Sequence, residues 1–92
     1  MSEKVLQTKI LRHLRSLKQS WWVKFPAGMY GIIGVPDILG CLSGQFYAFE
    51  VKFAKGKPTK LQLKTIDLIN RAGGRAFVVY SLEEVINAIN NV

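Results

Sequence analysis

Two strand-like apolar runs separated by Ser43-Gly44 are the feature that most constrains how this chain can fold. The two runs cover residues 37–42 and 45–53. If Ser43-Gly44 forms a two-residue turn, Leu42 pairs with Gln45 and Asp37 lies directly opposite Glu50. A four-residue loop would keep this register, whereas a three-residue loop would break it. The turn therefore predicts two carboxylates side by side on one face of an antiparallel strand pair.

Three helices and two further strands are expected around this hairpin. Apolar residues at helical spacing predict the first helix, and Ser-x-x-Glu or Thr-x-x-Gln capping boxes begin the other two. The helices are expected over residues 3–18, over residues 59–72 and from residue 82 onward, and the strands over residues 21–25 and 75–80. This order predicts an α/β fold with an αβββαβ core, a C-terminal helix and a mixed four-stranded sheet flanked by helices. Residues 26–36 form a loop long enough to carry function.

Length, charge and cysteine content limit the classes of function. A chain of 92 residues is too short for two hydrophobic cores, so residues 1–92 are expected to form one domain. The 13 basic and 6 acidic residues give a net charge of +7, which favours a polyanionic partner such as nucleic acid. No apolar run could span a membrane and no signal peptide is evident, so a cytoplasmic protein is expected. The single cysteine, Cys41, excludes an internal disulfide and is expected in the core.

The opposed carboxylates predict a cation site. Like charges directly opposite each other repel, and a bound Mg²⁺ or Mn²⁺, which prefers oxygen ligands, would remove the conflict. Lys52 follows Glu50 by two residues and so points to the same face of the strand. The alternative is a solvated cluster of charges, which is the commoner meaning of Glu-x-Lys alone. The position of Pro36 directly before Asp37, and the scarcity of acids in the chain, favour the metal site.

Four stretches, taken in order, resemble the virus-type replication–repair nuclease (VRR-NUC) domain of the PD-(D/E)xK superfamily. They are Gly34-Val35-Pro36-Asp37-Ile38, Phe49-Glu50-Val51-Lys52, Thr59-Lys60-Leu61-Gln62 and Ala72-Gly73-Gly74-Arg75-Ala76-Phe77-Val78. The resemblance implies that Asp37 and Glu50 ligate a catalytic Mg²⁺ or Mn²⁺, with the backbone carbonyl of Val51 as a further ligand. It also implies that Lys52 orients or activates the attacking water. Family members often carry basic residues where this chain has Ile33 and Phe53.

Two more residues match the family pattern at the rim of the site. Gln62 matches a glutamine near the metal, and Glu3 matches a glutamate of the first helix that joins the metal shell, directly or through water. Each also has a purely structural interpretation. Gln62 completes a capping box with Thr59, and an acid such as Glu3 is favoured in any first helical turn.

A run of lysines near the carboxylates predicts contacts with nucleic-acid phosphates. These are Lys55, Lys57, Lys60 and Lys64, and no acid occurs between Val51 and Ile66. Such a run is more often a solvated surface. Beside a metal site, however, phosphate binding is the better interpretation.

The resulting hypothesis is a metal-dependent endonuclease that hydrolyses DNA phosphodiesters, acting on branched DNA such as four-way (Holliday) junctions in phage replication or repair. One alternative is a non-catalytic nucleic-acid-binding module, and another is a structural subunit of a larger complex. An apolar content of 49%, with leucines and isoleucines on several sides of the 59–72 helix, favours a homodimer. The alternative is a monomer in which the other two helices bury that helix on both sides.

Overall fold

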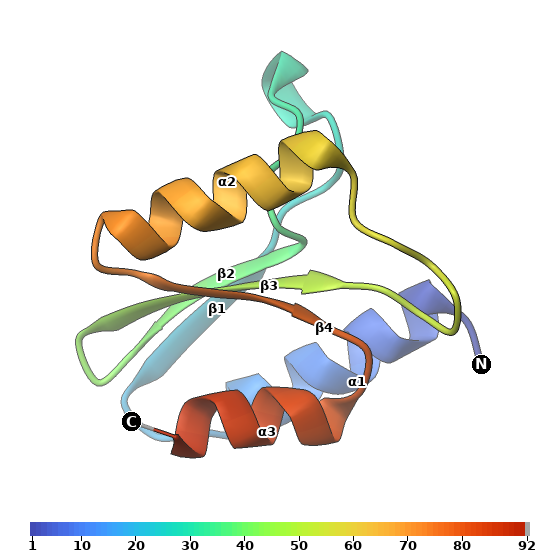
Figure 1. Ribbon diagram of the computed structural model, residues 1–92. Helices are drawn as coiled ribbons and strands as arrows, with labels where there is room; N and C mark the ends of the chain where they lie inside the picture. Colours follow the sequence, from blue (N-terminus) through green and yellow to red (C-terminus); the bar gives the residue numbers. More distant parts are fainter. Residues whose placement is uncertain (92) are drawn as a thin grey trace.

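The predicted hairpin forms the centre of the sheet. A computed structural model describes residues 1–91 of the protein. Its four strands, in spatial order, are β1 (Ser20–Lys24), β2 (Ile38–Leu42), β3 (Gln45–Val51) and β4 (Arg75–Val79). The helices are α1 (Glu3–Arg15), α2 (Lys60–Arg71) and α3 (Leu82–Asn90), with a short 3₁₀ helix, η1 (Met29–Gly31), in the long loop. The α/β fold and its mixed sheet are therefore as predicted (Figure 1).

The register of the hairpin is the predicted one. Leu42 pairs with Gln45, and Ile38 pairs with Phe49 at the other end of the ladder. The turn residues Ser43 and Gly44 both have positive φ, as a turn that follows the twist of an antiparallel hairpin requires. The strand pair β1–β2 is also antiparallel, whereas β3 and β4 are parallel because α2 carries the chain across between them.

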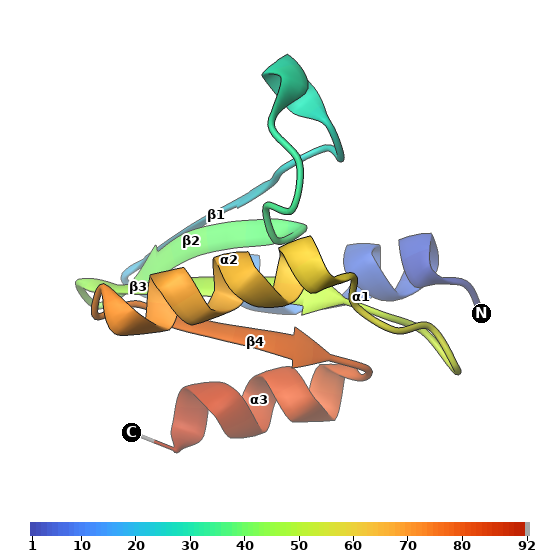
Figure 2. The ribbon, with the colours of Figure 1, turned by 45° about the horizontal axis from the view of Figure 1, so that its top comes forward.

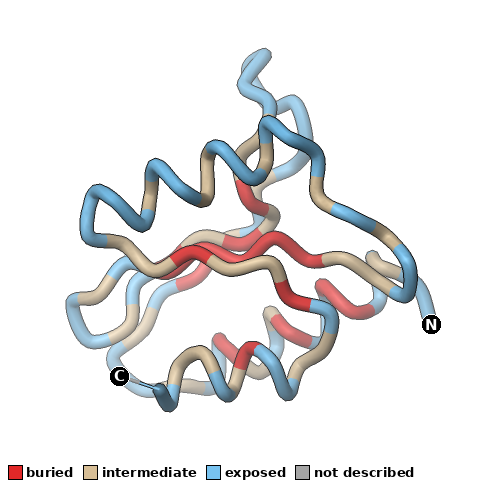
Figure 3. The backbone as a smooth tube through the Cα atoms, in the orientation of Figure 1, coloured by how far each residue is buried: buried red, intermediate tan, exposed pale blue. Residues whose placement is uncertain are grey.

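The helices cover the two faces of the sheet unequally. Helices α1 and α3 lie on one face and α2 lies alone on the other (Figures 1 and 2). The core fills the space between the sheet and the α1–α3 pair, where the buried positions concentrate (Figure 3). Its largest members are Ile10, Leu14, Trp22, Tyr47 and Phe49. The expectation that the other two helices could bury α2 on both sides is therefore wrong, because Leu61, Leu63 and Leu68 are 40–56% exposed.

Several predicted boundaries shift by a few residues. The first helix ends at Arg15 rather than Lys18, because the backbone N–H and the hydroxyl of Ser16 both donate to the carbonyl of His13. The 59–72 helix has Thr59 and Ala72 as its caps. Its capping box forms as predicted, but in the last helix the Glu84 carboxylate accepts from Tyr80 rather than from Ser81. Among residues 1–91, no helix is long and apolar enough to cross a membrane.

The prediction that Cys41 lies in the core is wrong, because Cys41 is exposed. Its strand neighbours explain this: Cys41 pairs with Trp21 on one side and with Phe46 on the other. These side chains share the α2 face of the sheet, and the contacts of α2 with the sheet are mainly with β4. The part of that face over β1 and β2 therefore stays open, and Trp21 is 68% exposed while Trp22, on the opposite face, is 3% exposed.

Gly40 provides a test of the packing between β1 and β2. A Cβ atom at Gly40 would lie 2.3 Å from both the carbonyl oxygen of Trp21 and the ring of Trp22. We expect Gly40→Ala to lower the free energy of unfolding by about 1–3 kcal/mol, since overpacking a closely packed site forces its neighbours apart. Urea unfolding curves measure this. Cys41→Ala, at the next and exposed position, should change stability by less than about 0.5 kcal/mol. Equal stability of the two variants would contradict the packing described.

Candidate metal and nucleic-acid site

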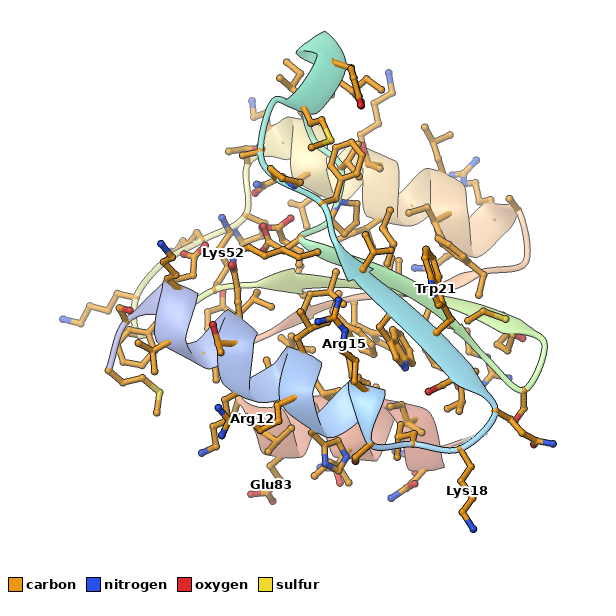
Figure 4. All side chains as sticks on the ribbon, turned by 180° about the vertical axis from the view of Figure 1, so that it is seen from behind. Arg12, Arg15, Lys18, Trp21, Lys52 and Glu83 are labelled. Carbon is orange, nitrogen blue, oxygen red and sulfur yellow. The ribbon has the colours of Figure 1, made fainter. Side chains whose placement is uncertain are left out.

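The candidate site lies where β2 begins and β3 ends. Asp37 directly precedes β2, Glu50 is the penultimate residue of β3, and Lys52 follows that strand. The pairing of Ile38 with Phe49 places Asp37 opposite Glu50 one step further along the ladder. The hairpin thus brings together the three residues that the sequence predicted to act together. Figure 4 shows Lys52 at this end of the sheet, well away from Trp21.

Asp37 is held in place through both its side chain and its backbone. Its Oδ2 accepts a hydrogen bond from the backbone N–H of Val51 at 2.8 Å, and its carbonyl accepts one from the N–H of Phe25 at 2.7 Å. These bonds tie the residue before β2 to both neighbouring strands. One carboxylate oxygen, Oδ1, has no protein hydrogen-bond partner among residues 1–91 and remains available to a ligand.

Glu50 is a buried acid with an unsatisfied oxygen. Only 1% of the residue is exposed. Its Oε2 lies 3.5 Å from the ammonium of Lys52, whose side chain is 14% exposed, while Oε1 is buried with no hydrogen-bond partner among residues 1–91. Leaving a buried carboxylate oxygen unpaired is costly. The interpretation of these residues as a solvated charge cluster is therefore wrong.

The surroundings of Glu50 change its acidity. Its pKa is raised from 4.5 to about 8, mainly by burial, then by the charge of Asp37 and by the hydrogen bond that the protonated form of Glu50, but not the ionised form, can donate to Asp37. The ammonium of Lys52 opposes this shift but does not cancel it. The repulsion expected between the two opposed carboxylates is thus one of the causes of the raised pKa of Glu50, after burial.

The donor set fits a hard divalent cation. Two adjacent carboxylates, with free oxygens on both, are the ligands that Mg²⁺ and Mn²⁺ prefer. No group of three or more His, Cys, Asp or Glu side chains gathers anywhere in residues 1–91, so the protein side chains at this point are the pair alone. Backbone carbonyls and waters complete such sites in many proteins, so the role of the Val51 carbonyl stays a prediction.

Glu3 and Gln62 lie on opposite sides of Asp37. Glu3 and Asp37 both line a cleft of about 430 Å³ beside helix α1, here called the α1-side cleft. Gln62 and Asp37 both line a second cleft, of about 310 Å³, beneath the long loop, here called the loop-side cleft. The side-chain oxygen of Gln62 accepts from the N–H of Thr59, so its structural role as a cap is real. Its position beside Asp37 also permits the functional role that the resemblance implies.

Gln7 is a residue of the site that sequence reasoning missed. It is buried, with 8% exposure, and lines the α1-side cleft one helical turn after Glu3, together with Lys24 from β1. No hydrogen bond of its side-chain amide to residues 1–91 occurs, so the amide is free to face a ligand in the cleft. A signal was available, because Gln7 is a polar residue within the stripe of α1 that faces the core.

Comparisons with known proteins agree with this geometry. No family model matches the sequence, and no curated protein matches it. Two solved structures do match the fold. One, described as a VRR_NUC domain, has a TM-score of 0.79 and 27% sequence identity, covering 97% of this chain and 95% of its own. Another, described as a VRR_NUC domain protein, has a TM-score of 0.76 and 20% identity, covering 97% of this chain and 85% of its own. The chain therefore has a fold similar to that of VRR_NUC domains over nearly its whole length. The resemblance noted from four short motifs therefore extends over nearly the whole fold.

The four lysines predicted to bind phosphate lie on the segments that follow β3, and none of them lines the two clefts at Asp37. Lys55 and Lys57 lie in the connection from β3 to α2, and Lys60 and Lys64 lie on the first turns of α2. All four are exposed, and none forms an ion pair with an acid among residues 1–91. Their charges are therefore directed to solvent and available to a polyanion.

The raised pKa of Glu50 predicts how stability depends on pH without metal. Between pH 4.5 and about 8 the folded protein holds a proton on Glu50 that the unfolded chain releases, so the free energy of unfolding falls as pH rises through this range. Urea unfolding in EDTA at a series of pH values measures the slope. Glu50→Gln should remove this contribution, and equal slopes for the two proteins would contradict the assignment.

Proposed function

We propose that this chain is a metal-dependent endonuclease that hydrolyses DNA backbone phosphodiesters at the Asp37–Glu50 pair. The observation that carries the proposal is the buried carboxylate of Glu50, whose unpartnered oxygen lies beside Asp37 and Lys52 in a VRR_NUC-like fold. Such a carboxylate is costly in the metal-free protein and becomes favourable once a cation binds. The resemblance further implies a role in phage replication or repair in the bacterial cytoplasm.

Each residue of the site would have a separate chemical role. Asp37 and Glu50 would hold Mg²⁺ or Mn²⁺, with the Val51 carbonyl as a further ligand. Glu3 lines the α1-side cleft but does not gather with the pair, so its contribution to the shell would pass through water. When bound, such an ion polarises the phosphoryl oxygen and stabilises the leaving alkoxide. Lys52, with its ammonium 3.5 Å from Glu50, is positioned to hold the attacking water or to neutralise charge that develops on the phosphate. Gln62 lies at the rim, where its amide can contact the substrate.

DNA binding is supported by the distribution of charge. The net charge is +7, and the unpaired lysines at positions 55, 57, 60 and 64 lie on the segments that follow β3, next to Lys52. Lys4 and Lys24 add positive charge at the α1-side cleft. A DNA backbone that crosses the site would therefore meet cations on both sides of the carboxylates.

The rival function is a nucleic-acid-binding module without catalysis, in which the acids serve only as ion-pair partners. The single Lys52–Glu50 contact favours it to a limited extent. A binding module without catalysis, however, does not explain why Oε1 of Glu50 is buried without a hydrogen-bond partner. Cleavage assays with Mg²⁺, Mn²⁺ and EDTA on branched and linear DNA separate the two functions, since the binding module cuts no DNA under any condition.

Removing one metal ligand should abolish cleavage and preserve DNA binding. We expect Asp37→Asn and Glu50→Gln to lose at least about 100-fold in cleavage rate, while binding is kept or improves because a negative charge near phosphate is lost. Lys52→Met should lose cleavage and remain folded. Single-turnover cleavage and gel-shift titrations measure the two effects. Glu83→Gln, which changes an exposed acid of α3 on the other side of the sheet from α2, is the matched control and should cleave normally. Wild-type cleavage by pure Asp37→Asn protein would refute the site.

We further propose that the domain acts as a homodimer on branched DNA. Helix α2 covers its face of the sheet alone, and its outward leucines, with Trp21 and Phe46 on the open part of that face, leave an apolar surface exposed. Burial of this surface against a second copy would place two sites under one two-fold axis, which suits paired cuts in a four-way junction.

Light scattering at micromolar concentration should therefore give twice the monomer mass. A Leu63→Glu variant should have the mass of a monomer, because a charge placed in an apolar interface destabilises the dimer. Cleavage of a four-way junction should exceed cleavage of a matched linear duplex, and the Leu63→Glu variant should lose this preference. A wild-type monomer with no preference for the junction would refute the dimer and leave the nuclease proposal intact.

A further inference from the structure

The two clefts that meet at Asp37 differ in chemistry. The α1-side cleft carries several charged or polar side chains, among them Glu3, Lys4, Gln7 and Lys24, beside the apolar Phe25, Pro26 and Ala27. In the loop-side cleft the only charged side chain is Asp37 itself. Its other lining is largely apolar and includes Phe25, Ile32, Ile33, Val35 and Leu61. The charged side chains around Asp37 therefore lie on its α1 side, and the loop side offers aliphatic and aromatic side chains without a cation.

The loop-side cleft has walls that are fixed by packing. The loop projects beyond the N-terminal end of α2 (Figures 1 and 2), and Gly34 anchors it there. A Cβ atom at Gly34 would lie 2.7 Å from Cγ of Leu61 and 3.2 Å from the hydroxyl of Thr65, so the loop backbone rests directly on α2. The φ of Gly34 is +82°, a conformation that also favours glycine. Gly34 therefore fixes the position of the loop against α2 at this wall of the cleft.

One free polar group faces this apolar space. The oxygen of the Gln62 side chain is used by the N–H of Thr59, but its amide nitrogen has no hydrogen-bond partner among residues 1–91. Gln62 thus offers a fixed donor at the edge of a cleft that also holds the aromatic ring of Phe25. An aromatic ring, aliphatic walls and one directed donor suit the flat face and polar edge of a nucleobase.

We propose that the loop-side cleft receives one unpaired nucleobase of the DNA whose backbone passes Asp37. This inference rests on the proposed function and adds to it a determinant of substrate choice. A phosphate has no cation to meet in this cleft, whereas the sugar and base are the parts of a nucleotide that extend away from the backbone. A paired base lies inside the duplex stack and cannot enter. The cleft would thus favour DNA that has an unpaired nucleotide next to the cleaved bond, as branched and flapped DNA do.

Replacing single bases by abasic sites tests the proposal on DNA that is bound but not cut. The protein is Lys52→Met, which lies outside the cleft, and the ligand is a flapped duplex that carries one abasic site at each position in turn around the expected cut. Omission of the base that enters the cleft should weaken binding about tenfold, and omission of the others much less. In the Ile33→Ala, Lys52→Met double variant the penalty at that position should shrink to about twofold. Val5→Ala in the same background changes an exposed apolar residue of α1 that lines neither cleft; it is the matched control and should keep the full penalty.

Each result decides the question. An abasic penalty that is the same with and without Ile33→Ala, or absent at every position, overturns the proposal. A fall in molecular mass on Ile33→Ala in light scattering also overturns it, and assigns the cleft to a second copy of the chain. Wild-type cleavage of the intact flap is measured separately. If the abasic penalty depends on Ile33 but the wild-type protein does not cleave, the base pocket is supported and the nuclease proposal is refuted. If the wild-type protein cleaves but no such penalty is found, the nuclease proposal is supported and the base pocket is refuted.

Discussion

Burial of the Glu50 carboxylate beside Asp37 is the physical constraint on which the site depends. A carboxylate with 1% exposure and a single ammonium 3.5 Å away is not stabilised enough to stay ionised at neutral pH, and its pKa of about 8 expresses this. The surrounding strands keep Glu50 in this position although the metal-free protein would be more stable without the conflict. A cation binds the ionised form of the carboxylates and removes the cost of burying their charge. Cation binding should therefore increase the free energy of unfolding.

The hairpin keeps the two acids together because its register has little freedom. A slip of one residue between β2 and β3 would move Phe49 and Val51 from the core to the opposite face and bring Glu50 into the core. The bond from the Val51 N–H to Asp37 then fixes the residue that the ladder itself leaves unpaired. The geometry of the site is thus set by the same packing that stabilises the fold, and not by contacts between the acids, which repel.

The sequence was most informative where a local rule acts over few residues. The Ser43-Gly44 turn determined which residues face each other, and the Thr59–Gln62 capping box determined where α2 begins. It was least informative about which face of an element stays open. Cys41 alternates as a core residue would, and only the position of α2 over β4 leaves it exposed. Gln7 and the two clefts depend on how α1 and the long loop pack against Asp37, which is long-range information that no short motif contains.

Two sets of apolar residues at the surface of this domain have different surroundings. Trp21, Phe46 and the outward leucines of α2 lie on a broad, open face, which suits a surface of equal size such as a second copy. The side chains of the loop-side cleft line a cavity of about 310 Å³ beside an acid, which suits a small, flat group. Apolar side chains thus suit binding of a second copy on the α2 face and binding of a nucleobase in the loop-side cleft. Shape and distance from Asp37, rather than composition, distinguish the two roles.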